Sequence, residues 1–262
     1  MKRFSYSSLE TYKKCPAQFK IRYIDNVRKS DESIEAFMGK RIHEALEYLY
    51  NEILDGHIPF FDNIIDKYNS NWKDKWHDRI GIVRTEKSKN YYKSLGEDCI
   101  ARYYRKYSPF EEPIVGCEIE LNFTLDKDGK YTIKGIVDRL DHDGDGNWEI
   151  HDYKSGKRLL TQNQANKDSQ LAIYQIGLMS KDKDIKSVKL VWHFLQHSIE
   201  VESVRTEKQL DNLSLDIKRQ IDKIRSHIKS GVEFPVKKSI LCNWCYYWEE
   251  CPEQYDKNPF IK

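Results

Sequence analysis

The sequence has no long apolar segment. No run approaches the roughly 18 consecutive apolar residues that a membrane-spanning helix needs, and the first ten residues lack the apolar stretch of a signal peptide. The chain also contains no internal repeat and no low-complexity linker. We therefore expect a cytoplasmic protein without a membrane partner, folded as one domain over residues 1–262.

The chain is polar but still rich in residues that can form a core. Of its 262 residues, 33% are charged and 39% are hydrophobic, and the 13% that are aromatic can supply bulky anchors. This composition excludes disorder throughout. Because the cytosol keeps thiols reduced, the six cysteines favour metal ligation, catalysis or packing over a disulfide framework. Cys99 and Cys117 lie in apolar patterns, and we assign them to packing.

The formal charge of +2 hides strongly uneven segments. Residues 1–30 carry eight Lys or Arg against two acids, and residues 218–238 carry seven against two. Residues 138–152 are the opposite, with six carboxylates and one arginine. Basic surfaces around an acidic, cation-binding spot suit enzymes that handle phosphodiesters, although charge runs are more often solvated helix faces.

Helical spacing dominates the first 110 residues. Ser7 begins a capping-box pattern and predicts the start of a first helix, and a longer helix is predicted after Ser33. Helical patterns with possible breaks at Gly81 and Gly96 continue through residues 60–108. We interpret residues 55–110 as a helical insertion.

Alternation of apolar and polar residues predicts strands in the middle of the chain. Short turns rich in Gly, Asp and Asn separate the first three strands, which should therefore form an antiparallel meander. We predict strands over 117–124, 131–140, 148–154, 188–194 and 199–205, and helices over 166–180 and 207–229. The order helix, three-strand meander, helix, strand indicates an α/β fold.

An acidic strip in the meander has the composition of a metal site. Asp152 and Lys154 are two residues apart on a predicted strand, so both side chains project from one face. The hairpin can bring Asp138 beside Asp152, and adjacent carboxylates repel unless a cation such as Mg²⁺ or Mn²⁺ lies between them. These three groups could support metal-dependent phosphodiester hydrolysis. A surface hairpin with ordinary ion pairs explains the same residues equally well.

Three more residues could join this site, and each has a simpler explanation. His43 could ligate a metal through a neutral imidazole nitrogen, although a lone His is more often a packing residue. Gln170 and Tyr174 are one helical turn apart and could reach a phosphate or a water, or only pack. Residues 141–146 match the opening of a calcium loop, but flanking strand patterns favour a polar turn.

Three cysteines near the C-terminus are close enough to share one metal centre: Cys242, Cys245 and Cys251. Cys15 is the candidate fourth ligand, since it and Cys251 precede prolines, as ferredoxin cluster cysteines do. We expect residues 231–262 to close on Cys15 and join the two ends of the chain. The spacing does not separate an iron–sulfur cluster from a zinc site, and four unlinked cysteines remain the simplest alternative.

In chain order, these motifs resemble the RecB-like PD-(D/E)XK nucleases that carry an iron–sulfur cluster. That group includes the nuclease domain of AddB and the small CRISPR-associated exonucleases. The motifs that carry the resemblance are Tyr12-x-x-Cys15-Pro16, Gly39-x-x-x-His43, Gly135-x-Val137-Asp138, Asp152-Tyr153-Lys154-x-Gly156, Gln170-x-x-x-Tyr174 and the cysteine triplet. Val137 stands where the family name has proline.

The resemblance implies a restriction-endonuclease-like α/β core whose two ends are stapled by a 4Fe–4S cluster. The implied metal ligands are His43, Asp138, Asp152 and Tyr153. The implied catalytic set also contains Lys154, Gln170 and Tyr174, and the implied cluster ligands are Cys15, Cys242, Cys245 and Cys251. Glu118 could be an extra carboxylate near the metal.

Two functions follow from these motifs. The first is a Mg²⁺- or Mn²⁺-dependent DNA exonuclease that acts on single strands or DNA ends in CRISPR adaptation or DNA repair. The second is a non-catalytic adaptor that binds DNA ends for a partner such as a CRISPR integrase. The filled aspartate and lysine positions favour the enzyme. Because the sequence has no Gly-x₄-Gly-Lys-Ser/Thr, a helicase would have to be a separate subunit.

Overall fold

The computed structural model describes residues 2–253, so the last nine residues of the predicted tail 231–262 lie outside the described residues. The chain begins with β1 (Arg3–Phe4), α1 (Tyr6–Lys14), α2 (Pro16–Phe19) and a π-helical turn (Lys20–Ile24). No helix within the described range combines the length and apolarity needed to cross a membrane.

The first helix starts earlier than its sequence pattern predicts. Ser5 is the N-cap: its Oγ accepts a hydrogen bond from the N–H of Ser8 at 3.2 Å, and Ser8 Oγ lies 2.9 Å from the N–H of Ser5. This reciprocal pair satisfies two helix-end donors, so the capping box predicted from Ser7 was wrong by two residues. The helix stops at Cys15, which is extended and precedes Pro16.

The predicted insertion contains two helices and a short strand. After β2 (Glu32–Ser33) and α3 (Ile34–Leu54) come α4 (Phe61–Asp74), β3 (Ile80–Gly81) and α5 (Lys89–Tyr107). The predicted start of α3 is confirmed, since Ser33 Oγ caps the N–H of Ala36. The predicted break at Gly96 was wrong: α5 continues through it, and a Cβ there would lie 2.1 Å from Tyr68 Oη on α4.

The sheet confirms the predicted order of elements. Strands β4 (Ile114–Thr124), β5 (Thr132–His142) and β6 (Asn147–Lys154) form the antiparallel meander. The chain then passes through α6 (Gln162–Ala165) and α7 (Gln170–Lys181) to β7 (Ser187–Phe194), which pairs parallel to β6. Strand β8 (Ile199–Val204), α8 (Glu207–Ser230) and a 3₁₀ turn (Ile240–Trp244) complete the described elements.

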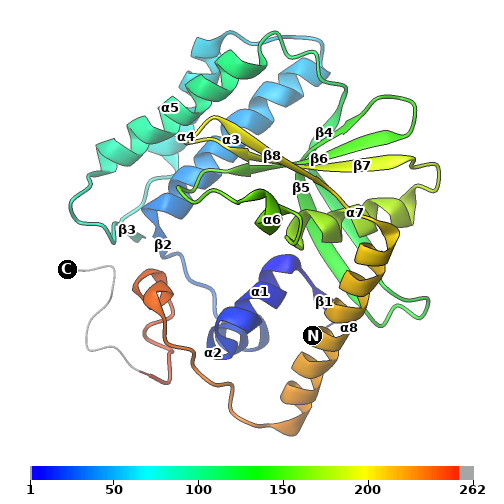
Figure 1. Cartoon of the computed structure of the whole chain (residues 1–262). Coiled ribbons are helices and arrows are strands. Elements are labelled where there is room, and N and C mark those ends of the chain that lie inside the picture. The colour runs from blue at the N-terminus through cyan, green and yellow to red at the C-terminus, as the bar shows by residue number, and fades with distance from the viewer. Residues whose placement is uncertain (1, 254–262) are drawn as a thin grey trace.

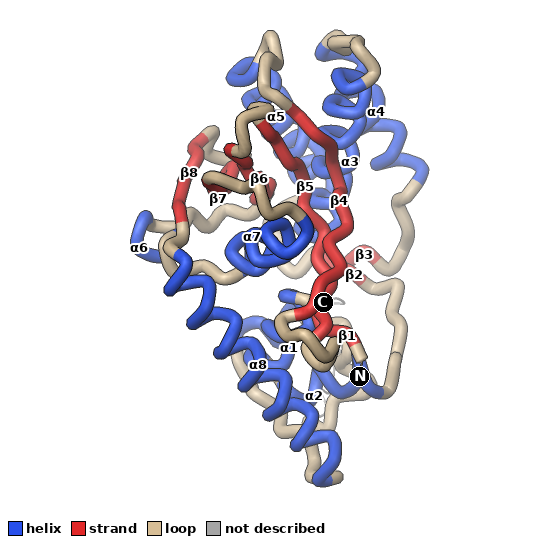
Figure 2. The backbone as a smooth tube through the Cα atoms, turned by 90° about the vertical axis from the view of Figure 1, so that its right-hand side faces the viewer, coloured by secondary structure: helices blue, strands red, loops and turns tan. Residues whose placement is uncertain are grey.

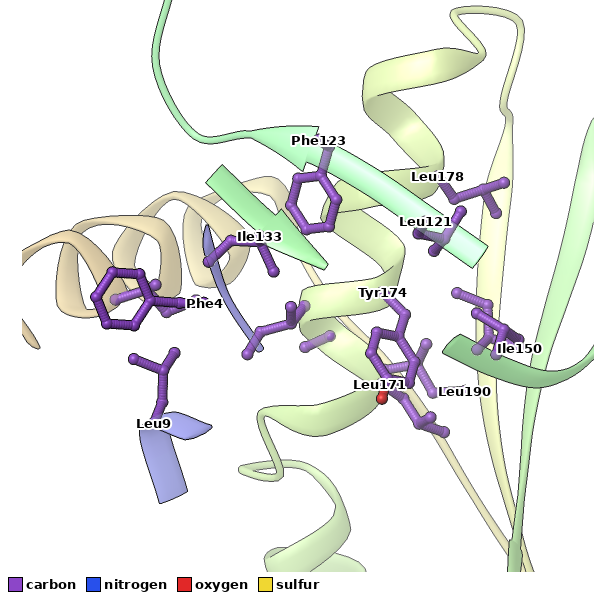
Figure 3. Close-up of a cluster of buried hydrophobic side chains, with 14 of the residues drawn as sticks. Phe4, Leu9, Leu121, Phe123, Ile133, Ile150, Leu171, Tyr174, Leu178 and Leu190 are labelled. Carbon is purple, nitrogen blue, oxygen red and sulfur yellow. The ribbon is translucent and has the colours of Figure 1, made fainter. Parts of the chain in front are cut away.

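Helices cover both faces of the sheet. Helices α3, α4 and α5 pack on one face, and α7, α8 and α1 lie on the other (Figures 1 and 2). The core between the sheet and helices α1, α7 and α8 is shown in Figure 3. There Phe123 of β4, Ile133 of β5 and Ile150 of β6 pack in one cluster with Leu171 and Tyr174 of α7. The segment after α8 returns to α1 and α2, so the tail with its cysteines lies beside the N-terminal helices (Figure 1).

The β5–β6 turn is closed by its own hydrogen bonds. Asp143 Oδ1 accepts from the N–H groups of Asp145 at 2.8 Å and Asn147 at 3.1 Å. Asp141 instead lies in the core, paired with Arg139. These side chains do not converge as calcium ligands, and the polar hairpin turn is the correct interpretation.

Candidate active site

The meander strands separate at the two predicted aspartates. Arg139 and His151 are the last paired residues of β5 and β6, so Asp138 and Asp152 follow at the fork. Asp138 Oδ2 accepts a hydrogen bond from the N–H of Tyr153 at 2.8 Å. Burial, and then the charge of Asp152, raises the pKa of Asp138 to about 7. A cation at the fork would relieve this electrostatic cost.

Asp152, Lys154 and Gln170 form a closed set of contacts. Lys154 Nζ lies 2.7 Å from Asp152 Oδ2 and donates to Gln170 Oε1 at 2.8 Å. Gln170 Nε2 donates to Asp152 Oδ1 at 2.7 Å. The ion pair lacks the angle of a hydrogen bond, so Asp152 Oδ2 is a buried acceptor without a hydrogen-bond donor. A metal ion at this oxygen would have to displace the ammonium group of Lys154, which lies 2.7 Å away.

Helix α7 brings Tyr174 to the same place. Tyr174 follows Gln170 by one turn, and its ring packs against Gly135 of β5. Burial raises the pKa of Tyr174 to about 12, and the carboxylates of Asp152 and Asp138 act in the same direction. The hydroxyl is therefore protonated at neutral pH and can donate a hydrogen bond.

His43 and Glu118 approach the fork from the other side of Asp138. His43 Nε2 lies 2.9 Å from the carbonyl oxygen of Tyr153, and its Nδ1 lies 3.6 Å from Asp138 Oδ2. Ligand atoms of His43, Glu118 and Asp138 all lie within 4.8 Å of one another. Glu118 also has a φ of 50°, which is rare for a non-glycine residue and costs conformational energy.

An open cleft of about 620 Å³ between α3 and β4 leads to these ligands. Gly39 precedes His43 by one helical turn, and a Cβ on Gly39 would lie 2.7 Å from Ser155 Oγ. The missing side chain lets the segment that follows β6 pack against α3. This contact explains why the helix has glycine four residues before His43.

The donor set fits a hard divalent cation. The fork offers two carboxylates, one imidazole nitrogen and one peptide carbonyl, at Asp138, Asp152, His43 and Tyr153. Oxygen-rich sets of this kind suit Mg²⁺ or Mn²⁺. Glu118 adds a third carboxylate on the α3 side. Of the predicted ligands, His43 and Asp138 lie together with Glu118, whereas Asp152 does not join this group of ligand atoms and acts on Asp138 through its charge.

A buried polar network behind the site was missed in the sequence. Arg139 is 1% exposed, and its guanidinium contacts the side chains of Tyr50, Tyr103, Asp141 and His151. Tyr103 Oη lies 3.2 Å from Tyr153 Oη, so the network reaches the residue between Asp152 and Lys154. The sequence did contain a signal for this network. Arg139 directly follows Asp138 and therefore points to the opposite, apolar face of the strand, where a buried charge needs polar partners.

The four cysteines line one cavity of about 230 Å³ between the N-terminal helices and the tail. Cys245 Sγ accepts from Gln18 Nε2 at 3.7 Å, and Cys242 Sγ accepts from the N–H of Ser239 at 3.4 Å. Burial raises the pKa of Cys245 to about 11, and the nearby Cys251, Cys15 and Cys242 reinforce the shift. The Cys245 thiol is therefore protonated at neutral pH, and a metal centre would have to displace its proton to bind the sulfur.

Comparison with known proteins agrees with this geometry. Residues 3–252 match the model of the PD-(D/E)XK nuclease superfamily. The chain therefore belongs to this superfamily, whose members cleave nucleic acids with divalent metals. No curated protein matches the chain.

Two solved structures are similar to this chain. The structure of a "Putative exonuclease" from Eubacterium rectale is 13% identical, with a TM-score of 0.55, and the match covers 98% of this chain and 90% of that one. At that identity the likeness concerns the fold alone. A protein called SSO0001 is 14% identical, with a TM-score of 0.39 over 95% of this chain and 96% of its own.

Proposed function

We propose that this protein is a Mg²⁺- or Mn²⁺-dependent deoxyribonuclease of the RecB-like branch that removes nucleotides from single strands or DNA ends. The observation that carries the proposal is the closed set of contacts among Asp152, Lys154 and Gln170 beside Asp138. A structural ion pair would not need a second, half-buried carboxylate at the same fork.

The residues of the fork have separate parts in this reaction. Asp138, Asp152, the Tyr153 carbonyl and His43 would hold the metal, which lowers the pKa of a bound water and neutralises phosphate charge. Lys154 faces the same space and can orient the water or stabilise the transition-state charge. Gln170 positions Lys154 and Asp152 through its two hydrogen bonds. Tyr174 can donate a hydrogen bond to a phosphate oxygen.

A basic groove supports a nucleic-acid substrate. The groove, of about 950 Å³, runs between α1 and α8 and contains Lys13, Arg219, Lys223 and Lys237. Glu10 and Asp216 also line it and pair with Lys13 and Arg219, so the net positive charge comes from Lys223 and Lys237. Tyr6 lines its end nearest the fork, where the charges of Asp168 and Asp152 contribute to raising the tyrosine pKa after burial itself. Cations along such a groove bind phosphates by counterion release.

The cysteines support a 4Fe–4S cluster more than a zinc ion. Adjacent sulfurs of a tetrahedral zinc site lie about 3.8 Å apart, as the Zn–S bond length requires. Among residues 2–253, no three cysteine sulfurs lie within 4.8 Å of one another. All four nevertheless line one cavity, which suits a larger cluster with hydrogen bonds to its sulfurs. The cluster would staple residues 231–253 to Cys15.

The cellular setting is part of the same proposal. A single domain with residues 55–110 as an insertion carries no ATP-hydrolysing motif. A helicase would unwind DNA for this protein in DNA repair, and a CRISPR integrase would receive the DNA from it in CRISPR adaptation.

The test measures cleavage of end-labelled linear and circular single-stranded DNA, with Mg²⁺, with Mn²⁺ and with EDTA. The wild type should degrade the linear DNA only when a metal is present. Asp152→Ala and Lys154→Ala should abolish cleavage and retain the absorbance of the cluster, whereas Lys183→Ala, on an exposed residue beyond α7, should behave as wild type. Binding without cleavage by the wild type would identify the adaptor instead.

A further inference from the structure

A cavity of about 230 Å³, separate from the cysteine cavity of the same size, opens beside the end of β6, and we call it the β6 cavity. It begins at Ser155 and Gly156, directly after Lys154, and extends to Tyr91 on α5 and Trp244 in the tail. It is smaller than common ligand pockets, so it has room for one ring system and not for a duplex.

Aromatic rings and unpaired cations line this cavity. Tyr91 is 43% exposed, and Lys87 Nζ lies 3.5 Å from the centre of its ring. Arg84, Lys87 and Lys157 have no carboxylate within 4.0 Å anywhere in residues 2–253. The one acid in the lining, Glu35, accepts a hydrogen bond from Tyr92 Oη at 2.8 Å. The cavity is therefore positive, and three aromatic side chains lie in its wall: Tyr91, Tyr92 and Trp244.

We propose that this cavity binds one unpaired nucleotide of the substrate next to the cleavage site. The base stacks on Trp244 and takes the place of Lys87 Nζ over the Tyr91 ring, which frees Lys87 to neutralise the adjoining phosphates together with Arg84 and Lys157. A base inside a duplex is stacked between its neighbouring pairs and cannot offer its faces to these rings. This subsite rests on the proposed nuclease function and gives it a physical reason to prefer single strands and frayed ends.

Trp244 also links the subsite to the cysteines. It lies between Cys242 and Cys245 in the chain, and it lines both the cysteine cavity and the β6 cavity. The loop that closes around the cysteines therefore sets the position of one wall of the subsite. If the cysteines lose their metal centre, the loop that carries Trp244 should move, and substrate binding should weaken. The centre would then have a structural effect on binding and not a redox one.

The experiment measures the affinity of the holoprotein for labelled single-stranded DNA by fluorescence anisotropy in EDTA, where no cleavage occurs. An abasic residue is placed at each position of the oligonucleotide in turn. The wild type should lose roughly tenfold in affinity when the abasic residue meets the two rings. Trp244→Ala should bind the intact strand about as weakly as the wild type binds this abasic strand. Placing the abasic residue at the same position should not lower the affinity of Trp244→Ala further.

Matched variants separate stacking from fold and charge. Trp244→Phe should restore much of the affinity, and Phe60→Ala, on an 81% exposed ring elsewhere, should have no effect. Lys87→Gln and Lys157→Gln should each reduce the slope of log affinity against log salt by about one, whereas Lys208→Gln on α8 should not.

Wild-type affinity in Trp244→Ala, or equal abasic profiles in both proteins, would overturn the subsite. If those results occur while the wild type still cleaves DNA, the nuclease proposal survives. If the wild type neither binds nor cleaves nucleic acid, the nuclease proposal itself fails, and the subsite fails with it.

Discussion

Gly135 of β5 and Tyr174 of α7 pack so closely that a Cβ on Gly135 would lie 2.5 Å from Cε1 of the tyrosine ring. The missing methyl group allows α7 to bring Tyr174 against the sheet, one turn after Gln170 contacts Asp152. The glycine three residues before Asp138 therefore serves the site through helix packing.

Gly135→Ala should lower the free energy of unfolding by about 1–3 kcal/mol, because the ring or the strand must move. Cleavage should fall as well, since Tyr174 is displaced. Urea denaturation of Gly135→Ala, Tyr174→Ala and the double variant gives the measurement. The double variant should lose less than the sum of the two single losses. Strict additivity would contradict a direct clash between these residues.

The metal-free protein should become less stable as pH rises from about 4 to about 7. Folding raises the pKa of Asp138 from 3.8 to about 7, so the folded state binds more protons in this interval than the unfolded chain does. The loss should reach on the order of 2–4 kcal/mol and be complete above pH 7. The Asn side chain in Asp138→Asn cannot ionise, so the stability of this variant should not show this fall between pH 4 and pH 7.

In EDTA at pH 8, Asp138→Asn should therefore melt at a higher temperature than the wild type, and at pH 4 the two proteins should melt together. Added Mg²⁺ should raise the melting temperature of the wild type at pH 8 more than that of the variant. A variant that is less stable than the wild type at pH 8 would show that Asp138 is not electrostatically strained.

Arg139→Met should destabilise the fold by about 3–5 kcal/mol, because it leaves Asp141 buried without its cation. Adding Asp141→Asn should recover part of that loss. Urea denaturation measures both effects, with Arg105→Met on the exposed side of α5 as the control. Equal stability of Arg139→Met and the wild type would mean that the network adds nothing to the fold.

Cys245→Ser should remove the visible absorbance and the bound iron and lower the melting temperature, because the tail no longer closes on Cys15. Cys117→Ser should retain both absorbance and iron, since Cys117 pairs with Arg139 across β4 and β5, away from the cavity. Iron and zinc analysis of the purified protein provides the readout. Stoichiometric zinc in a colourless wild type would exclude the cluster.

The order of the core elements could be predicted because each strand and helix has its own local period. Alternation around Cys117 and Asp152 identified β4 and β6, and Ser33 marked the start of α3. Local patterns were weaker at helix ends and at glycines. Ser5 displaced Ser7 as the cap, and Gly96 lies within α5 because Tyr68 needs its space.

The sequence by itself determined which chemical groups the protein has and at what spacing: two aspartates, a lysine, a histidine and four cysteines in family order. Only the tertiary structure decided that β5 and β6 separate at Asp138 and Asp152, that Arg139 lies in the core, and that Trp244 lines two cavities. The reason is physical. Periodicity reports which face a side chain takes on its own element, whereas contacts between distant segments depend on how those elements pack.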